Sequence, residues 1–103
     1  MEPNEYSVIV SSKAANQLRN HAAFLASVSP DAARKLVKEF QNAVATLKMF
    51  PNRCAWLEGE YMPVHTYHKL LFSKNHMLIF KVEGNIVLVE YVLDCRQNYS
   101  WLI

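Results

Sequence analysis

The sequence contains few glycines, few cysteines and no long apolar run. Only two of its 103 residues are glycine, which leaves no glycine-rich loop to cradle phosphate groups and argues against nucleotide-driven chemistry. Cys54 and Cys95 are far apart and lack CxxC spacing, so we expect free thiols rather than a zinc site or a disulfide framework. No apolar run approaches the roughly 18 residues that span a membrane, and no hydrophobic secretory segment follows the acidic start. These absences predict a soluble, cytoplasmic domain that uses no cofactor and meets no membrane.

The composition is that of an ordinary globular chain. Hydrophobic residues make up 51% and charged residues 19% of the sequence, so we expect one domain over residues 1–103 with a core of its own. The formal net charge of +2 is too small to indicate nucleic-acid binding by itself. The distribution of the charge is more informative than its sum.

The first half of the chain predicts a strand followed by two helices. Residues Tyr6–Val10 are β-prone, and apolar residues recur at helical spacing over 12–27 and 30–49. Ser12 is the expected N-cap of the first helix, and Ser29-Pro30 is a start signal for the second. Because the linker between them is very short, the helices should form an antiparallel hairpin.

The second half changes to the period of two that is typical of strands. After a loop over 52–63, three strands are expected, with turns between them, at Val64–Phe72, His76–Val82 and Ile86–Leu93. The order β-α-α-β-β-β predicts an α+β fold, with the helical hairpin packed on one face of a small antiparallel-rich sheet. Neither face of the predicted strands is cleanly polar, so the open face should be a partner or ligand surface.

One stretch of this second half is basic. No Asp or Glu occurs from Tyr61 to Val82, and the stretch contains His65, His68, Lys69, Lys74, His76 and Lys81. This pattern fits a phosphate-facing surface, or a hairpin that lysines simply keep solvated. His65 and His68, three residues apart on a predicted strand, should point to opposite faces, so we expect no metal site.

Arg96 follows the last predicted strand. Its guanidinium would suit a phosphate clamp in phosphoryl chemistry, or a salt bridge to Asp94. Tyr99 and Trp101 follow it and are more often packing residues.

Several segments, in this order and spacing, resemble the RelE/ParE superfamily of type II toxin–antitoxin toxins. They are Tyr6–Ser11, Leu47–Pro51, Tyr67–Phe72, His76–Phe80 and Val92–Gln97. The resemblance covers nearly the whole chain and implies the β-α-α-β-β-β layout. It also implies a small cognate antitoxin as partner, in a module of the kind linked to plasmid stabilization.

The resemblance implies one of two targets. One branch of the superfamily cleaves mRNA in the ribosomal A site, and the other poisons DNA gyrase. The places of the nuclease residues are held here by His68, Leu70, Met77 and Arg96, whereas the pattern His76–Phe80 is closer to the gyrase-directed branch.

The acid-free hairpin favours ribosome-dependent mRNA cleavage, which would make the chain an endoribonuclease (mRNA interferase). Arg96 would then stabilise charge, and His68 would transfer protons, with Tyr99 as a further catalytic candidate. The residues expected to hold the RNA are Lys69, Lys74, His76 and Lys81. The alternatives are a gyrase inhibitor that acts by protein binding, and an interaction domain without toxicity.

Overall fold

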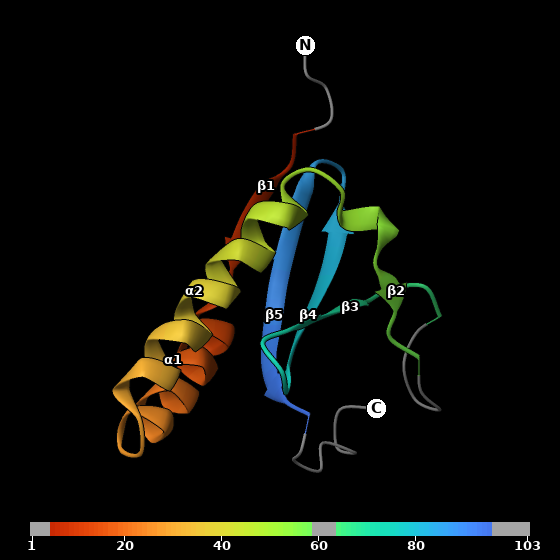
Figure 1. Cartoon of the computed structure of the whole chain (residues 1–103). Helices are drawn as coiled ribbons and strands as arrows, with labels where there is room; N and C mark the ends of the chain where they lie inside the picture. Colours follow the sequence, from red (N-terminus) through yellow and green to blue (C-terminus); the bar gives the residue numbers. More distant parts are fainter. Residues whose placement is uncertain (1–4, 59–63, 96–103) are drawn as a thin grey trace.

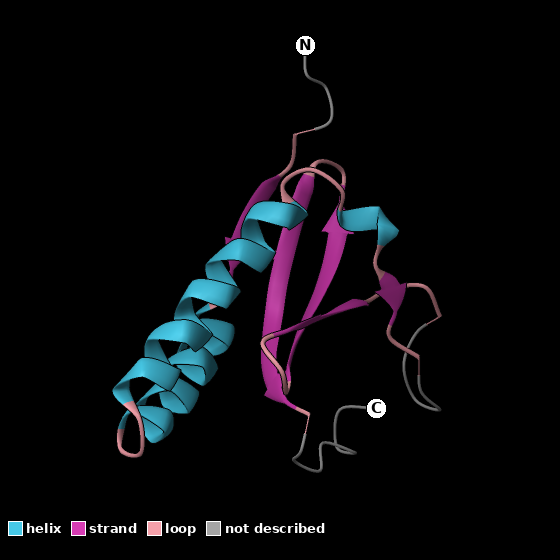
Figure 2. Cartoon of the chain, in the orientation of Figure 1, coloured by secondary structure: helices cyan, strands magenta, loops and turns pink. Residues whose placement is uncertain are grey.

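The computed structural model describes residues 5–58 and 64–95, which form two helices packed on one face of a five-stranded sheet (Figure 1). The strand order is β1-β5-β4-β3-β2. The elements are β1 (Ser7–Val10), α1 (Ser12–Ala26), α2 (Pro30–Leu47), the 3-10 turn η1 (Pro51–Arg53), β2 (Ala55–Trp56), β3 (His68–Phe72), β4 (His76–Glu83) and β5 (Ile86–Asp94). Figure 2 shows the helices and the sheet as separate layers, which confirms the predicted α+β fold.

The helical hairpin is fixed by a serine at the start of each helix. The Ser29 hydroxyl accepts the Ala32 amide at 3.2 Å and Pro30 is the first helical residue, as predicted. At α1 the prediction was wrong by one residue. Ser11, not Ser12, is the N-cap, and its hydroxyl accepts the Ala14 amide at 3.0 Å.

The sheet is antiparallel except at one edge. The described strands pair antiparallel between β2 and β3, β3 and β4, and β4 and β5, whereas β1 runs parallel to β5, with Ser7 opposite Ile86. The turn between β4 and β5 falls at Gly84, whose φ of +63° is the left-handed conformation that glycine adopts without strain. The prediction of an antiparallel-rich sheet is therefore confirmed.

The middle of the chain differs from the predicted strand over Val64–Phe72. The strand begins only at His68, because residues 64–66 form a turn in which His65 has a φ of +54°. A left-handed residue cannot continue an extended strand. The expected loop over 52–63 also contains more structure than predicted, since its first part includes the end of η1 and the short strand β2.

The core lies between the helices and the sheet, with a second, smaller cluster on the open face. The helix-side core consists of Ala14, Leu36, Phe40, Ala43, Leu47, Phe72, Leu78, Phe80, Val87, Val89 and Val92. On the open face, Leu57, Met77, Ile79 and Leu93 are buried under Tyr67, Tyr91 and Cys95. The open face is thus only partly polar, as the strand patterns predicted.

β5 contains a β-bulge and, beside it, a hydrogen bond to α1. The register between β4 and β5 shifts at Ile79/Phe80, so that Phe80 faces Val89 while Ile79 faces Tyr91, and Glu90 is the extra residue. The Gln17 side chain on α1 accepts the Val92 amide at 2.8 Å. Val92 lies two residues beyond Glu90, so α1 contacts β5 next to the bulge.

Candidate functional site

His68 lies inside a stack of aromatic rings. It faces Trp56 on β2 and Phe80 on β4, and its ring centroid is 4.0 Å from that of Trp56 and 5.1 Å from that of Phe80. Its Nδ1 lies 2.9 Å from the Cys54 carbonyl oxygen, and only 2% of the residue is exposed. The residue predicted to transfer protons is therefore enclosed by protein.

The outer side of this stack is closed by His65, whose ring lies 4.8 Å from that of Trp56. His65 and His68 thus both stack on Trp56, instead of pointing to opposite faces of one strand as the sequence suggested. The reason is the turn over 64–66, which takes His65 out of the strand. Among the described residues, no group of three or more His, Cys, Asp or Glu is placed to hold a metal ion.

His76, predicted to contact RNA, lies between the sheet and α1. It is 4% exposed, and its ring centroid is 5.2 Å from that of His21 on α1 and 5.7 Å from that of Phe72. The register explains this position, because His76 faces Phe72 across the β3–β4 turn. The helix layer covers the imidazole.

The three lysines of the predicted basic surface are in different surroundings. Lys69 and Lys74 are exposed. Lys81 is 3.4 Å from a Glu83 carboxylate oxygen and 3.7 Å from one of Glu90. The hydrogen bond with Glu83 and the charges of both glutamates raise the pKa of Lys81. Its positive charge is therefore balanced within the protein.

Glu90 is the centre of a polar cluster that sequence reasoning missed. The Tyr67 hydroxyl donates to its carboxylate at 3.4 Å, and its backbone carbonyl accepts the Ser11 hydroxyl at 3.3 Å. Burial of the phenol raises the pKa of Tyr67, and the Glu90 carboxylate raises it further. The available signal was a single acid in the apolar run Ile86–Leu93.

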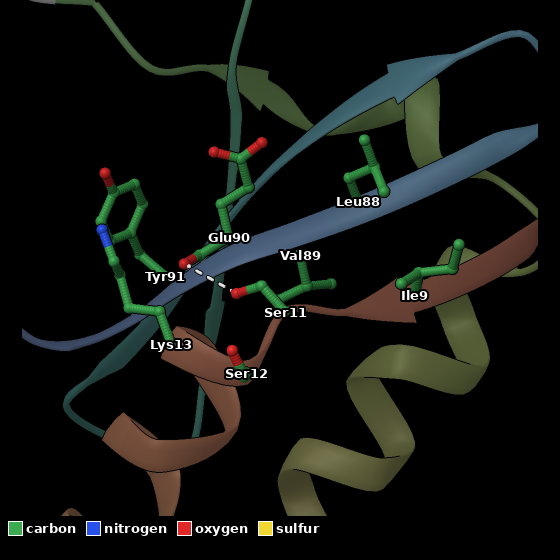
Figure 3. A pocket seen from close by; sticks show the side chains of 8 residues that line it. All are labelled: Ile9, Ser11, Ser12, Lys13, Leu88, Val89, Glu90 and Tyr91. Carbon is green, nitrogen blue, oxygen red and sulfur yellow. Dashed lines mark hydrogen bonds between the residues drawn. The ribbon is translucent and has the colours of Figure 1, made fainter.

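Beside Glu90 a small cavity of about 230 Å³ opens between the start of α1 and the edge of the sheet (Figure 3). Ile9 and Leu88 contribute its apolar side. At its other end, the Lys13 ammonium lies 4.8 Å from the centroid of the Tyr91 ring, a cation–π arrangement. The cavity therefore combines an apolar wall with charged groups.

A larger cavity of about 530 Å³ lies where β2, β3 and the end of β5 meet. Its apolar lining includes Leu57, Leu71, Met77 and Cys95, and Lys69 is the charged residue that β3 contributes. Leu71 is 67% exposed although it belongs to a strand. Leu71 therefore adds an exposed apolar side chain beside the cavity, whose lining also includes Arg53 and Glu58.

The two thiols are free, as expected. Burial raises the pKa of Cys54, against the opposing charge of Arg53. Burial and the Asp94 carboxylate raise the pKa of Cys95, against the opposing charge of Lys69. Because the thiolate is the nucleophilic form, a raised pKa lowers the share of the reactive form of both cysteines at neutral pH.

Two of the predicted site residues, Arg96 and Tyr99, lie outside the described residues. The last described residue, Cys95, lines the 530 Å³ cavity together with Lys69. The described helices include none that is long and apolar enough to cross a membrane.

Comparison with known proteins gives the family. A model of the ParE toxin of type II toxin–antitoxin systems (parDE) matches residues 8–99. The chain belongs to the ParE toxin family. This confirms the resemblance to the RelE/ParE superfamily that the sequence segments indicated.

A solved structure has the same fold. It is described as a chromosomal ParDE toxin–antitoxin system from P. aeruginosa, and the superposition has a TM-score of 0.70 at 20% sequence identity. The match covers 88% of this chain and 97% of the other. No curated protein matches the chain.

Proposed function

We propose that this ParE family member is a growth-inhibiting toxin that acts by binding DNA gyrase, and that a cognate antitoxin neutralises it. The observation that carries this proposal is the burial of His68 between Trp56 and Phe80. A general acid or base must come within hydrogen-bond reach of the proton that it transfers. An imidazole enclosed on both ring faces, with Nδ1 beside the Cys54 carbonyl, does not offer that reach.

The surroundings of the other candidates support the same reading. Lys81 is balanced by Glu83 and Glu90, and Met77, at a place where nucleases of the superfamily hold a basic residue, is 5% exposed and apolar. A toxin that acts by protein binding needs an exposed apolar surface instead. Leu71, which is 67% exposed beside the 530 Å³ cavity, supports such a surface.

The second candidate function is ribosome-dependent mRNA cleavage. Lys69 and Lys74 are exposed on the acid-free stretch, and Arg96 directly follows Cys95, which lines the same cavity as Lys69. In this reading Arg96 would stabilise charge on the phosphorane, and Tyr99 would assist. Arg96→Ala would then slow cleavage by about 10²–10³-fold, the usual cost of removing one such electrostatic contact.

The antitoxin partner is supported by the family, which is that of the toxin in a toxin–antitoxin system, and by the structural relative, whose description names a ParDE system. We expect the partner to be encoded beside this gene. Its co-expression should restore growth to cells in which the chain is induced.

Induction of the chain in cells separates the candidates. Gyrase inhibition predicts a DNA-damage response with intact mRNA, whereas the nuclease predicts new mRNA 5′ ends and an arrest of translation. Growth without arrest would contradict both and would indicate an interaction domain that lacks toxicity. Lys74→Ala, a variant of the exposed turn, separates the candidates further, because it should weaken toxicity only if the chain holds RNA.

A further inference from the structure

One edge of the sheet has no partner strand among the described residues. The strand order places β1 outermost, beside β5, with which it runs parallel (Figure 1). The amides of Ser7 and Ser11 both donate toward β5, at 2.9 Å each. Because backbone groups alternate in direction along a strand, the N–H and C=O groups of Val8 and Val10 point away from β5. Within the described ranges, no loop or helix end bonds to the backbone of these two valines.

This edge lacks the features that usually prevent a further strand from pairing. Natural edge strands carry charged side chains, proline or a β-bulge. Residues 6–12 contain no charged residue and no proline, and the register between β1 and β5 is regular. Ile9, in the middle of β1, is 49% exposed. The opposite edge differs, because β2 is only two residues long and lies between Arg53 and Glu58.

The backbone of β1 is complementary to a second copy of itself. In an antiparallel pair whose two-fold axis passes between the two Ile9 residues, Val8 of each copy lies opposite Val10 of the other. The outward N–H and C=O groups of these residues then exchange hydrogen bonds on both sides of the axis. The two Ile9 side chains form the closer, non-hydrogen-bonded pair at the axis and cover each other.

Other antiparallel registers of the two copies fit less well. A register with Val8 opposite Val8 would place Val10 opposite Tyr6. The Tyr6 amide already donates to the Lys48 carbonyl at the end of α2, at 2.8 Å, and is not available to another strand. The register centred on Ile9 uses only the valine groups that point outward.

The charges at the two ends of β1 match in the same register. Antiparallel pairing brings Glu5 of one copy to the end of the strand at which Lys13 of the other copy lies. Glu5 is exposed, and Lys13 lines the 230 Å³ cavity at the start of α1 (Figure 3). Neither residue forms an ion pair with another described residue. Pairing two copies would therefore join opposite charges twice.

We propose that β1 pairs with β1 of a second copy, so that the chain forms a symmetric dimer with one continuous sheet. This dimer does not depend on the target proposed above. A single pair of four-residue strands is a small interface. The dimer should therefore be weak, with a dissociation constant of roughly 10–100 μM.

Sedimentation velocity of the purified chain, from about 1 μM to 1 mM, measures the association. The mass should rise from that of the monomer to twice that value. Ile9→Lys should remain monomeric, because two ammonium groups would then face each other across the axis. Val64→Lys is the matched control, since Val64 is 78% exposed in the turn before β3 and should leave the dissociation constant unchanged.

The fold should tolerate Ile9→Lys. Ile9 belongs to neither apolar cluster of the described chain, so the variant should unfold in dilute solution at the same temperature as the native protein. Unfolding of the native chain at a higher temperature in concentrated than in dilute solution would be a second sign of association.

Reversal of the charges tests the register without changing an apolar residue. Glu5→Lys and Lys13→Glu should each weaken the dimer by about 3-fold or more, because an attractive contact becomes repulsive at both ends. The double variant Glu5→Lys/Lys13→Glu should restore the native dissociation constant to within about 2-fold, since the opposite charges again meet.

Amide hydrogen exchange locates the contact. The amides of Val8 and Val10 should exchange slowly in concentrated solution and rapidly in dilute solution. The amides of Ser7 and Ser11, which bond toward β5, should be slow in both. These two serines are the internal control.

Three results would overturn the proposal. The first is a chain that stays monomeric up to about 1 mM. The second is a dimer that Ile9→Lys leaves intact, or that the double charge reversal does not restore, because such a dimer would use another surface or register. The third is equally rapid exchange of the Val8 and Val10 amides at every concentration.

Discussion

The rings of Trp56 and His68 lie nearly parallel, with 4.0 Å between their centroids and 22° between their planes. Trp56 belongs to a strand of two residues, and its register partner on β3 is His68. The stack continues to Phe80, which is completely buried. The row Trp56–His68–Phe80 therefore connects the short edge strand β2 to the core.

Replacement of the imidazole by another ring tests that role. His68→Phe should retain toxicity, because a phenyl ring fills the same space between Trp56 and Phe80. The replacement loses only the contact of Nδ1 with the Cys54 carbonyl oxygen. His68→Ala should lower the free energy of unfolding by roughly 3 kcal/mol, as is usual when a buried ring is removed. Growth assays and urea unfolding of the two variants measure both effects.

A nuclease that uses His68 for proton transfer would behave differently. His68→Phe would then reduce activity by about 10²–10⁴-fold, the usual contribution of such a group, while the fold remained intact. A stable but inactive His68→Phe variant would contradict the structural role.

Two leucines of neighbouring strands should separate stability from toxicity. Leu78 on β4 is fully buried, so Leu78→Ala should cost about 2–5 kcal/mol of unfolding free energy. Leu71 on β3 is 67% exposed, so Leu71→Ala should change stability by no more than about 0.5 kcal/mol. If the open face binds the target, Leu71→Ala should nevertheless weaken growth inhibition. A Leu71→Ala variant with native toxicity would show that the surface around Leu71 does not bind the target.

The phenol of Tyr67 should lose its proton at a higher pH than an ordinary tyrosine. Burial and the Glu90 carboxylate raise its pKa above the usual value of 10, so the folded protein favours the neutral hydroxyl. The neutral Tyr67 phenol therefore contributes to the free energy of unfolding. This contribution is complete below pH 10 and is lost as the pH rises through the raised pKa of Tyr67 in the folded protein. An ultraviolet titration should show one tyrosine step above pH 10 that Tyr67→Phe removes. Its persistence in that variant would assign the step to another tyrosine.

Both thiols should react slowly in the folded protein. Because burial raises the pKa of Cys54 and of Cys95, little thiolate is present at pH 7.5. Alkylation by iodoacetamide, followed by mass spectrometry of the two peptides, should be slower than in the urea-unfolded chain. It should accelerate as the pH rises. Equal rates in the folded and unfolded chains would show that the sites are open and unperturbed.

The sequence predicted the helical hairpin well because its signals are local. Ser29 and Pro30 act on the backbone within one turn, so the start of α2 is visible without tertiary contacts. At the start of α1 the same reasoning was wrong by one residue, because Ser11 and Ser12 are equivalent as caps in the sequence. Only the Ser11 hydroxyl lies near both the Ala14 amide and the Glu90 carbonyl.

The surroundings of the candidate site depended on contacts that sequence spacing does not contain. The burial of His68 requires Trp56, which belongs to a strand of two residues that is too short to be recognised in the sequence. The turn at His65 was also missed, because the sequence predicted a continuous strand there. The balance of charge at Lys81 requires Glu90, which the β-bulge adds to β5 as an extra residue. Both contacts join residues that are brought together only when the strands pair.

DNA supercoiling by purified gyrase in the presence of the purified chain tests the proposed gyrase inhibition most directly. If the chain inhibits gyrase, the native chain and His68→Phe should reduce supercoiling equally, and Leu71→Ala should reduce it less. In parallel, mRNA incubated with translating ribosomes and the native chain should remain intact. Normal supercoiling together with mRNA cut in the ribosomal A site would contradict gyrase inhibition and establish the nuclease.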